Sequence, residues 1–220
     1  MTHPQPQGFL ATPADGTGPG ALVLHAWWGL NGTIRAICTH LAEAGFVAFA
    51  PDLYQGRVVD TIAEAEALVK ALNADDRQAR AAIAEAVRFL SERASQASGG
   101  LAVIGFSLGA YYALELASAD PEQIGSVVLF YGTGDADLSQ SRARYLGHFG
   151  ESDEFEPQAG VDALEAALRQ AGRPATFYRY SGAGHWFFEP DRADAYDQAA
   201  ASLAWERTLA FLRQPAADVH

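Results

Sequence analysis

The chain has 220 residues, 49% of them hydrophobic, and carries a formal net charge of −12 from 27 acidic and 15 basic residues. This length can bury the core of one domain, and the negative charge argues against nucleic acid or an anionic membrane surface as a partner. The sequence shows no N-terminal apolar leader, no run of about 20 apolar residues and a single cysteine, Cys38, and we therefore expect a cytoplasmic protein. The sequence contains no pair of cysteines or histidines at the spacing of metal ligands, and no glycine-rich loop of the kind that binds phosphate.

Short apolar runs alternate along the chain with longer stretches of helical spacing. The predicted strands are, in chain order, 21–25, 46–50, 101–106, 126–131, 143–149 and 175–180. Most of these runs are apolar on both faces, as in parallel strands that helices cover on each side. The alternation predicts an α/β fold with a mostly parallel sheet.

Apolar residues at three- and four-residue spacing predict the helices between the strands. One helix begins near Gly32, and the next two carry the apolar faces Ile62, Ala65, Val69, Leu72 and Ile83, Ala86, Val87, Leu90. Further helices are expected at 108–118, at 161–170 and from about Asp191 to Arg213, the last with Trp205, Leu209 and Leu212 at core positions. Gly45 and Gly172 are expected to end helices, and the Pro/Gly-rich segment 12–20 is expected to connect an edge strand near Phe9 to the first central strand.

The segment Gly105-Phe106-Ser107-Leu108-Gly109 lies where the predicted strand 101–106 meets the predicted helix 108–118. A Gly-x-Ser-x-Gly segment in this context is typical of a nucleophile elbow, in which a strained turn exposes the serine hydroxyl at the edge of the sheet. The pattern predicts Ser107 as a nucleophile. The alternative is a tight Gly/Ser turn that has no catalytic role.

A serine hydroxyl needs a base, which a carboxylate orients, and in this kind of fold the order along the chain is Ser, Asp or Glu, His. His185 fits this order because it lies in Gly182-Ala183-Gly184-His185-Trp186, between the last predicted strand and the last predicted helix. The other histidines fit less well: His3 and His220 lie near the chain ends, His40 lies in a helix, His148 lies inside a strand, and His25 ends the first central strand, where it could line the site.

The orienting carboxylate is predicted to be Asp153, which follows the strand 143–149 and precedes His185 by 32 residues. Asp135 and Asp137, which follow the preceding strand, are alternatives, and Glu151 and Glu154 lie close by. The non-catalytic interpretation of Asp153 is an Asx turn.

These segments, together with Leu24-His25-Ala26-Trp27-Trp28-Gly29-Leu30-Asn31, Ala50-Pro51-Asp52-Leu53-Tyr54 and Gly184-His185-Trp186-Phe187, resemble the dienelactone hydrolase family over nearly the whole chain. The resemblance implies one α/β-hydrolase domain over 1–220, with helices on both faces of the sheet, no large cap domain, no cofactor and the triad Ser107, Asp153 and His185. It also implies an oxyanion hole formed by the backbone amides of Trp27 and Leu108. Residues expected near the substrate are His25, Trp28, Tyr54, Trp186 and Phe187.

Three positions depart from the family pattern. Ser107 stands where the characterised dienelactone hydrolases have a cysteine, and Ala26 stands where they have a glutamate that activates the cysteine. Glu189 stands where an arginine helps to hold the carboxylate of the lactone, and Arg57, Arg77 or Arg192 could supply a cation instead. The paired loss of the cysteine and its glutamate favours ordinary serine esterase chemistry.

We therefore expect a serine hydrolase that cleaves small carboxylic esters or lactones through an acyl-enzyme on Ser107, with His185 as base and Asp153 as orienting acid. The first alternative is a dienelactone hydrolase acting on a carboxylate-bearing lactone. The second is a binding protein that keeps the fold without the activity. The expected partner is a small-molecule substrate, and the sequence fits either a monomer or a homodimer.

Overall fold

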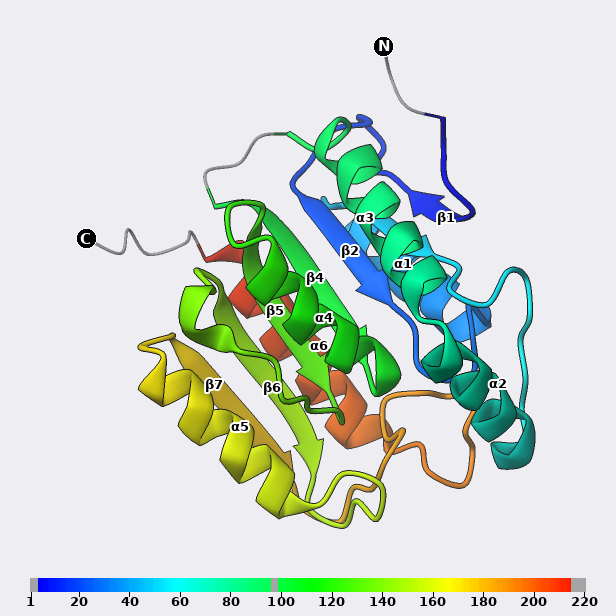
Figure 1. The fold of residues 1–220 in the computed structure, drawn as a ribbon, viewed down its shortest axis with the longest axis vertical. Coiled ribbons are helices and arrows are strands. Elements are labelled where there is room, and N and C mark those ends of the chain that lie inside the picture. Colours follow the sequence, from blue (N-terminus) through cyan, green and yellow to red (C-terminus); the bar gives the residue numbers. More distant parts are fainter. Residues whose placement is uncertain (1–3, 96–98, 215–220) are drawn as a thin grey trace. The chain divides into compact units, whose positions relative to one another are not determined.

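The computed structural model describes residues 4–95 and 99–214, which belong to two compact units, 1–97 and 98–220. Figure 1 gives the place of each helix and strand in the chain. Both units alternate strands with helices, as predicted. None of the helices in the described ranges is both long and apolar enough to cross a membrane.

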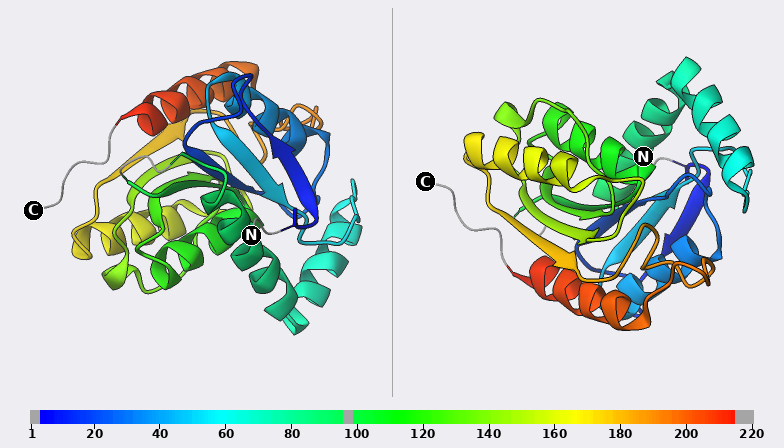
Figure 2. Two further views of the ribbon diagram at one scale, coloured as in Figure 1. Left: turned by 90° about the horizontal axis from the view of Figure 1, so that it is seen from above. Right: turned by 90° about the horizontal axis from the view of Figure 1, so that it is seen from below.

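The first unit contains three strands in the order β1-β3-β2. Strand β2 runs parallel to β3, with Ala21 opposite Ala48, and β1 runs antiparallel to β3, with Phe9 opposite Ala50. Helices α1 and α3 pack against opposite faces of β2 and β3 (Figure 2). The elements are β1 (Gly8–Ala11), β2 (Gly20–Leu24), α1 (Gly32–Glu43), β3 (Val47–Pro51), α2 (Ile62–Ala74) and α3 (Arg77–Ser91).

The second unit contains four parallel strands that lie side by side in chain order. Helices α4 and α5 cover one face of these strands and α6 covers the other (Figure 2). The elements are β4 (Leu101–Phe106), α4 (Leu108–Ala119), β5 (Ile124–Phe130), the 3-10 helix η1 (Leu138–Gln140), β6 (Arg144–Gly150), α5 (Gln158–Gln170), β7 (Ala175–Tyr180) and α6 (Gln198–Arg213). Because the strands are parallel, the segments that follow β4, β5, β6 and β7 meet at one edge.

Burial explains why continuous apolar runs predicted the central strands correctly. Every residue of β2, β3 and β4 is buried, so both faces of these strands contact other parts of the protein. The observed strands start and end within two residues of the predicted limits. Gly45 and Gly172 follow α1 and α5 with φ values of 98° and 68°, a backbone conformation that favours glycine at helix ends.

The prediction for the start of the last helix was wrong, because α6 begins at Gln198 rather than near Asp191. The Asp197 carboxylate accepts hydrogen bonds from the amides of Ala199 and Ala200, so this residue is the helix cap. The amide of Asp197 in turn donates to the carbonyl of Phe187, which holds the preceding segment in a folded loop. Asp191 and Asp197 both suit the start of a helix by residue type. Only the contact between Asp197 and Phe187 distinguishes them.

Two apolar faces also differ from prediction. In α6 the buried residues are Ala200, Ala201, Ala204 and Thr208. Trp205, Leu209 and Leu212, which were predicted at core positions, are only half-buried, and small residues face the core because they let the helix lie close to its neighbours. In α2 the buried residues are Ala65, Leu68 and Leu72, whereas Ile62 is 45% exposed.

Candidate active site

Ser107 occupies a strained turn between β4 and α4. Its φ and ψ angles are 49° and −110°, a conformation that costs an L-residue about 1–3 kcal/mol and persists only where neighbouring groups enforce it. Here the Ser107 amide donates to the Phe130 carbonyl at 2.9 Å, and the Ser107 carbonyl accepts from the Ala110 amide at 2.8 Å. These bonds fix the backbone while the hydroxyl group remains available to other partners.

Small residues surround this turn because there is no space for larger ones. A Cβ atom at Gly105 would lie 2.6 Å from the Cα of Ala110, and one at Gly132 would lie 2.5 Å from the Ser107 carbonyl oxygen. Cβ atoms in proteins essentially never lie within 3.0 Å of such an atom, so only glycine fits at these two positions. Gly105 was part of the predicted motif, whereas Gly132, which follows β5, carried no recognisable pattern.

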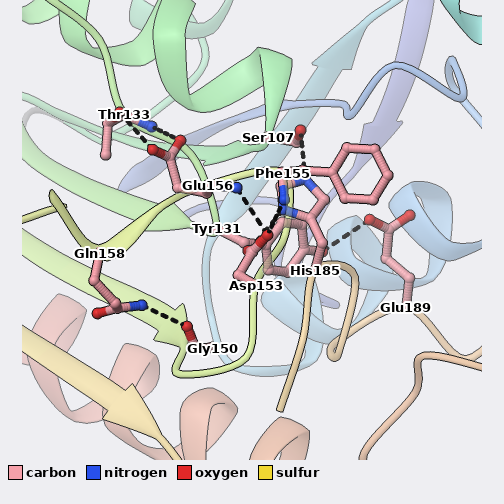
Figure 3. Close-up of polar contacts among 10 residues, drawn as sticks. All are labelled: Ser107, Tyr131, Thr133, Gly150, Asp153, Phe155, Glu156, Gln158, His185 and Glu189. Atoms are coloured by element: carbon pink, nitrogen blue, oxygen red, sulfur yellow. Dashed lines mark hydrogen bonds and ion pairs between the residues drawn. The ribbon is translucent and has the colours of Figure 1, made fainter. Parts of the chain in front are cut away.

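A chain of hydrogen bonds connects Ser107, His185 and Asp153 (Figure 3). The Ser107 Oγ lies 2.9 Å from the Nε2 of His185, and the Nδ1 of His185 lies 2.7 Å from the Oδ2 of Asp153. The His185 and Asp153 side chains are only 6% and 1% exposed. A carboxylate at Nδ1 favours the tautomer in which Nε2 accepts the serine proton. The geometry therefore suits proton removal from the serine hydroxyl.

The second oxygen of Asp153 is held by the backbone of its own loop. Its Oδ1 accepts the amide of Phe155 at 2.9 Å and the amide of Glu156 at 2.8 Å. Together with His185, these amides give the carboxylate three hydrogen bonds, which fix its orientation. The Asx-turn interpretation of Asp153 and the interpretation as partner of His185 are thus both compatible with one side chain.

The loop after β6 is also tied to the segment after β5 through Glu156. The Glu156 carboxylate accepts from the Thr133 amide at 2.8 Å and from the Thr133 hydroxyl at 2.9 Å, and burial raises the pKa of Glu156. Gln158 donates to the Gly150 carbonyl at 2.8 Å across the same loop (Figure 3). These contacts support the loop that carries Asp153, and no motif in the sequence predicted them.

Aromatic rings surround the imidazole of His185. The ring centroids of Tyr131, Trp186 and Phe155 lie 5.0, 5.0 and 5.3 Å from that of His185. Phe155 is 49% exposed and was not among the predicted residues. Its exposed ring beside the imidazole makes it a candidate for substrate contact, together with the half-buried Trp186.

Tyr131 and Glu189 form a buried polar pair next to His185. The Tyr131 hydroxyl donates to the Oε1 of Glu189 at 2.8 Å. Burial raises the pKa of Glu189 to about 8 and raises the pKa of Tyr131 well above its usual value. In the sequence, Glu189 is recognisable only as a departure from the family pattern, and no sequence pattern connects it to Tyr131.

His148 and His25 form hydrogen bonds with residues other than Ser107 and Asp153. His148 contacts the Tyr180 hydroxyl at 2.8 Å through Nδ1 and the Thr208 hydroxyl at 3.0 Å through Nε2, and burial lowers its pKa to about 3. In the first unit, the His25 Nδ1 contacts the Ala26 carbonyl and its Nε2 accepts the Leu53 amide, while burial lowers its pKa. Both rings are fully buried.

None of the remaining histidines is a candidate base in the part of the chain that the structure describes. His40 is exposed on α1. His3 and His220 lie outside the described residues.

The alternative acids lie on the surface. Asp135, Glu151 and Glu154 are exposed, and Asp137 accepts the Ser139 amide at the start of η1. The carboxylate that bonds His185 is that of Asp153.

The predicted cations differ in exposure. The Arg77 side chain is 87% exposed and pairs with Asp75 at 2.8 Å, and Arg57 is exposed as well. Arg192 is only 15% exposed and lies 3.9 Å from Asp191.

The other residues predicted to lie near the substrate occur in both units. In the first unit Trp28 and Tyr54 are buried, and in the second Phe187 is completely buried. Leu108 is the first residue of α4, so its amide has no acceptor within the helix. Trp27 is half-buried in the segment after β2.

Across residues 4–95 and 99–214, no group of three or more His, Cys, Asp or Glu side chains could hold a metal ion.

Comparisons with known proteins agree on one family. Residues 7–216 match the model described as "Dienelactone hydrolase family". A protein of Aquifex aeolicus (strain VF5) named "Putative carboxymethylenebutenolidase" is 32% identical over 220 residues, covering 94% of this chain and 92% of that protein. A Bradyrhizobium sp. protein named "Probable 2-oxo-3-(5-oxofuran-2-ylidene)propanoate lactonase" is 33% identical over 220 residues, covering 93% and 88%.

The solved structures give the same result for the fold. The "Putative Dienelactone Hydrolase" from Klebsiella pneumoniae subsp. pneumoniae MGH 78578 matches with a TM-score of 0.78 at 28% identity, covering 91% of this chain and 89% of that one. A more distant α/β-hydrolase shares the fold as well. The fold class predicted from the sequence is confirmed.

Proposed function

Because this chain belongs to the dienelactone hydrolase family, which its residues 7–216 match, we propose that it is a serine hydrolase of small carboxylic esters or lactones. The observation that carries the proposal is the hydrogen-bonded chain from Ser107 through His185 to Asp153. Each group has the neighbour that serine hydrolysis requires. The strained φ of Ser107 supports the same role.

In the proposed reaction, the Nε2 of His185 removes the hydroxyl proton of Ser107 while Oγ attacks the carbonyl carbon of the substrate. Asp153 stabilises the imidazolium that forms. The tetrahedral intermediate collapses when His185 donates this proton to the leaving alkoxide oxygen, which leaves an acyl group on Ser107. Water, deprotonated by the same imidazole, then releases the acid.

The developing oxyanion needs hydrogen-bond donors. The Leu108 amide suits this role because it lies at the N-terminus of α4, where the helix dipole favours negative charge. The second donor, the amide of Trp27, stays a prediction from the family resemblance.

The nature of the substrate distinguishes the main proposal from its first alternative. The relatives named as a carboxymethylenebutenolidase and a lactonase favour a lactone. A carboxylate-bearing lactone would need a cation at the site, but Arg57 and Arg77 of the first unit are exposed. In the second unit, Arg192 lies 3.9 Å from Asp191 and acts on the buried Glu189. We therefore propose uncharged small esters or lactones as preferred substrates.

The cytoplasmic location, the single domain over 1–220 and the monomeric or homodimeric state stay predictions. So does the absence of nucleic-acid or membrane partners, which the net charge of −12 supports.

Hydrolysis of p-nitrophenyl acetate and butyrate tests the proposal. Substitution Ser107→Ala is expected to reduce the rate to background with an unchanged circular dichroism spectrum. Ser139→Ala, which changes an exposed serine on η1, is the matched control and should keep the wild-type rate. An undiminished rate for Ser107→Ala would contradict the proposal, and no hydrolysis by the wild type would favour the binding protein.

A further inference from the structure

Glu189 is a buried carboxyl group that the proposed reaction does not use. It lies in the turn that follows His185, where its amide donates to the Trp186 carbonyl at 2.9 Å. The residue is 0% exposed. One carboxyl oxygen accepts the Tyr131 hydroxyl, whereas the other, Oε2, is buried and hydrogen-bonds no residue of the described ranges. A buried carboxyl group held in this way costs stability, so its position needs an explanation.

Tyr131 connects this carboxyl group to the imidazole. It follows β5 with a φ of 37°, a left-handed conformation that is unfavourable for a tyrosine, and its amide donates to the His148 carbonyl at 2.8 Å. Its ring contacts the ring of His185 while its hydroxyl reaches Glu189 (Figure 3). One side chain on a strained backbone position thus contacts both the base and the turn that carries the base.

We propose that Tyr131 and Glu189 are positioning residues for His185, which hold its ring toward Ser107 while Glu189 is neutral and release it when Glu189 ionises. This inference rests on the proposed function. It adds to that function an alkaline limit on activity that neither Ser107 nor Asp153 supplies.

The surroundings of Glu189 explain why ionisation would disturb the turn. Burial is the main reason that its pKa is raised to about 8, and the nearby Asp191 raises it further, while the Tyr131 hydrogen bond and Arg192 lower it. Asp153 and Asp191 also act on Tyr131. A carboxylate formed here would be a buried charge close to other negative charges, and it would be stabilised by opening the turn to water.

Rate measurements between pH 6 and 10 test the inference, with the ratio of kcat/KM at pH 9.5 to that at pH 7 taken within each variant. For the wild type, kcat/KM is expected to fall by about tenfold per pH unit above the Glu189 ionisation, so this ratio should lie well below one. Glu189→Gln keeps an acceptor for Tyr131 but cannot ionise, so its ratio should lack this fall. Tyr131→Phe removes a bond that favours the carboxylate, so its fall should begin at a higher pH than in the wild type.

Glu206→Gln, which changes an exposed glutamate on α6, is the matched control and should keep the wild-type profile. The inference is overturned if Glu189→Gln shows the wild-type alkaline fall, or if Tyr131→Phe shifts it to lower pH. Should Glu189→Gln not fold, the direction of the Tyr131→Phe shift decides alone. Failure of the proposed function looks different, because Ser107→Ala would then hydrolyse the ester as fast as the wild type.

Discussion

His185 and His148 are two buried histidines of the same unit with different surroundings. His185 lies in the loop after β7 between the Ser107 hydroxyl and the Asp153 carboxylate. His148 lies within β6 between the hydroxyl groups of Tyr180 and Thr208. Each ring therefore has both nitrogens hydrogen-bonded, and burial alone does not distinguish them.

The difference lies in the charge of the partners. A carboxylate at Nδ1 stabilises an imidazolium, which is what the proposed role of His185 as a base requires. Two neutral hydroxyl groups give His148 no such compensation, and burial lowers its pKa to about 3. His148 thus serves to join β6, β7 and α6, while His185 has the surroundings of a base.

Asp153→Asn should have the largest effect, because it removes the carboxylate that distinguishes the surroundings of His185 from those of His148. The amide can hold the ring in the wrong tautomer, and we expect kcat for p-nitrophenyl butyrate to fall by about 10⁴-fold with little change in KM. Asp137→Asn, on the exposed η1 segment, is the control and should keep kcat. A larger loss for Asp137→Asn than for Asp153→Asn would mean that the acid is assigned wrongly.

His148→Ala should have the opposite effect, on stability rather than on chemistry. It leaves the hydroxyl groups of Tyr180 and Thr208 buried without their partner and creates a cavity, so the free energy of unfolding should fall by about 3 kcal/mol. Urea denaturation measures this change. The folded fraction at pH 7 should still hydrolyse the ester, and a loss of kcat as large as that for Asp153→Asn would contradict a structural role.

The pH dependence of the free energy of unfolding tests whether His148 stays neutral in the folded protein. Because the folded pKa of His148 is lowered to about 3, the unfolded chain binds a proton at this residue between about pH 6.5 and pH 3 that the folded chain does not. This residue should therefore lower the free energy of unfolding by about 1.4 kcal/mol for each pH unit of acidification within that window. The slope should be smaller by this amount in His148→Ala, and equal slopes would show that His148 takes up a proton in the folded state.

Arg77→Ala should have the smallest effect. This side chain is 87% exposed and bonds the exposed Asp75, and exposed ion pairs contribute little. Neither Tm nor kcat/KM for an uncharged ester should change measurably. A selective loss of activity toward an anionic lactone would show that Arg77 holds a substrate carboxylate, in favour of the dienelactone alternative.

The sequence predicted what depends on local pattern. The run Leu101–Phe106 is continuous and apolar because β4 is buried on both faces, and the glycine at 105 stands where no side chain fits. Chain order and the position after a predicted strand favoured His185 and Asp153, but they left Asp135, Asp137, Glu151 and Glu154 open as acids. Only the hydrogen bond between Asp153 and His185 in the folded chain distinguishes Asp153 from these alternatives.

Contacts between distant segments could not be predicted in this way. Tyr131 and Glu189 are 58 residues apart, and Thr133 and Glu156 are 23 apart. Neither pair shows a periodicity or a motif, because the bonds depend on how the loops after β5, β6 and β7 pack. The start of α6 was misplaced for the same reason, since the bond from the Asp197 amide to Phe187 decides it.

Covalent trapping tests whether Ser107 is a nucleophile that His185 activates. The wild type would be treated with a fluorophosphonate, followed by intact-mass measurement and peptide mapping. We expect one added phosphonyl group on the peptide that contains Ser107, slower labelling in His185→Ala and none in Ser107→Ala. An unmodified wild type, or a label on any other residue, would contradict this role of Ser107.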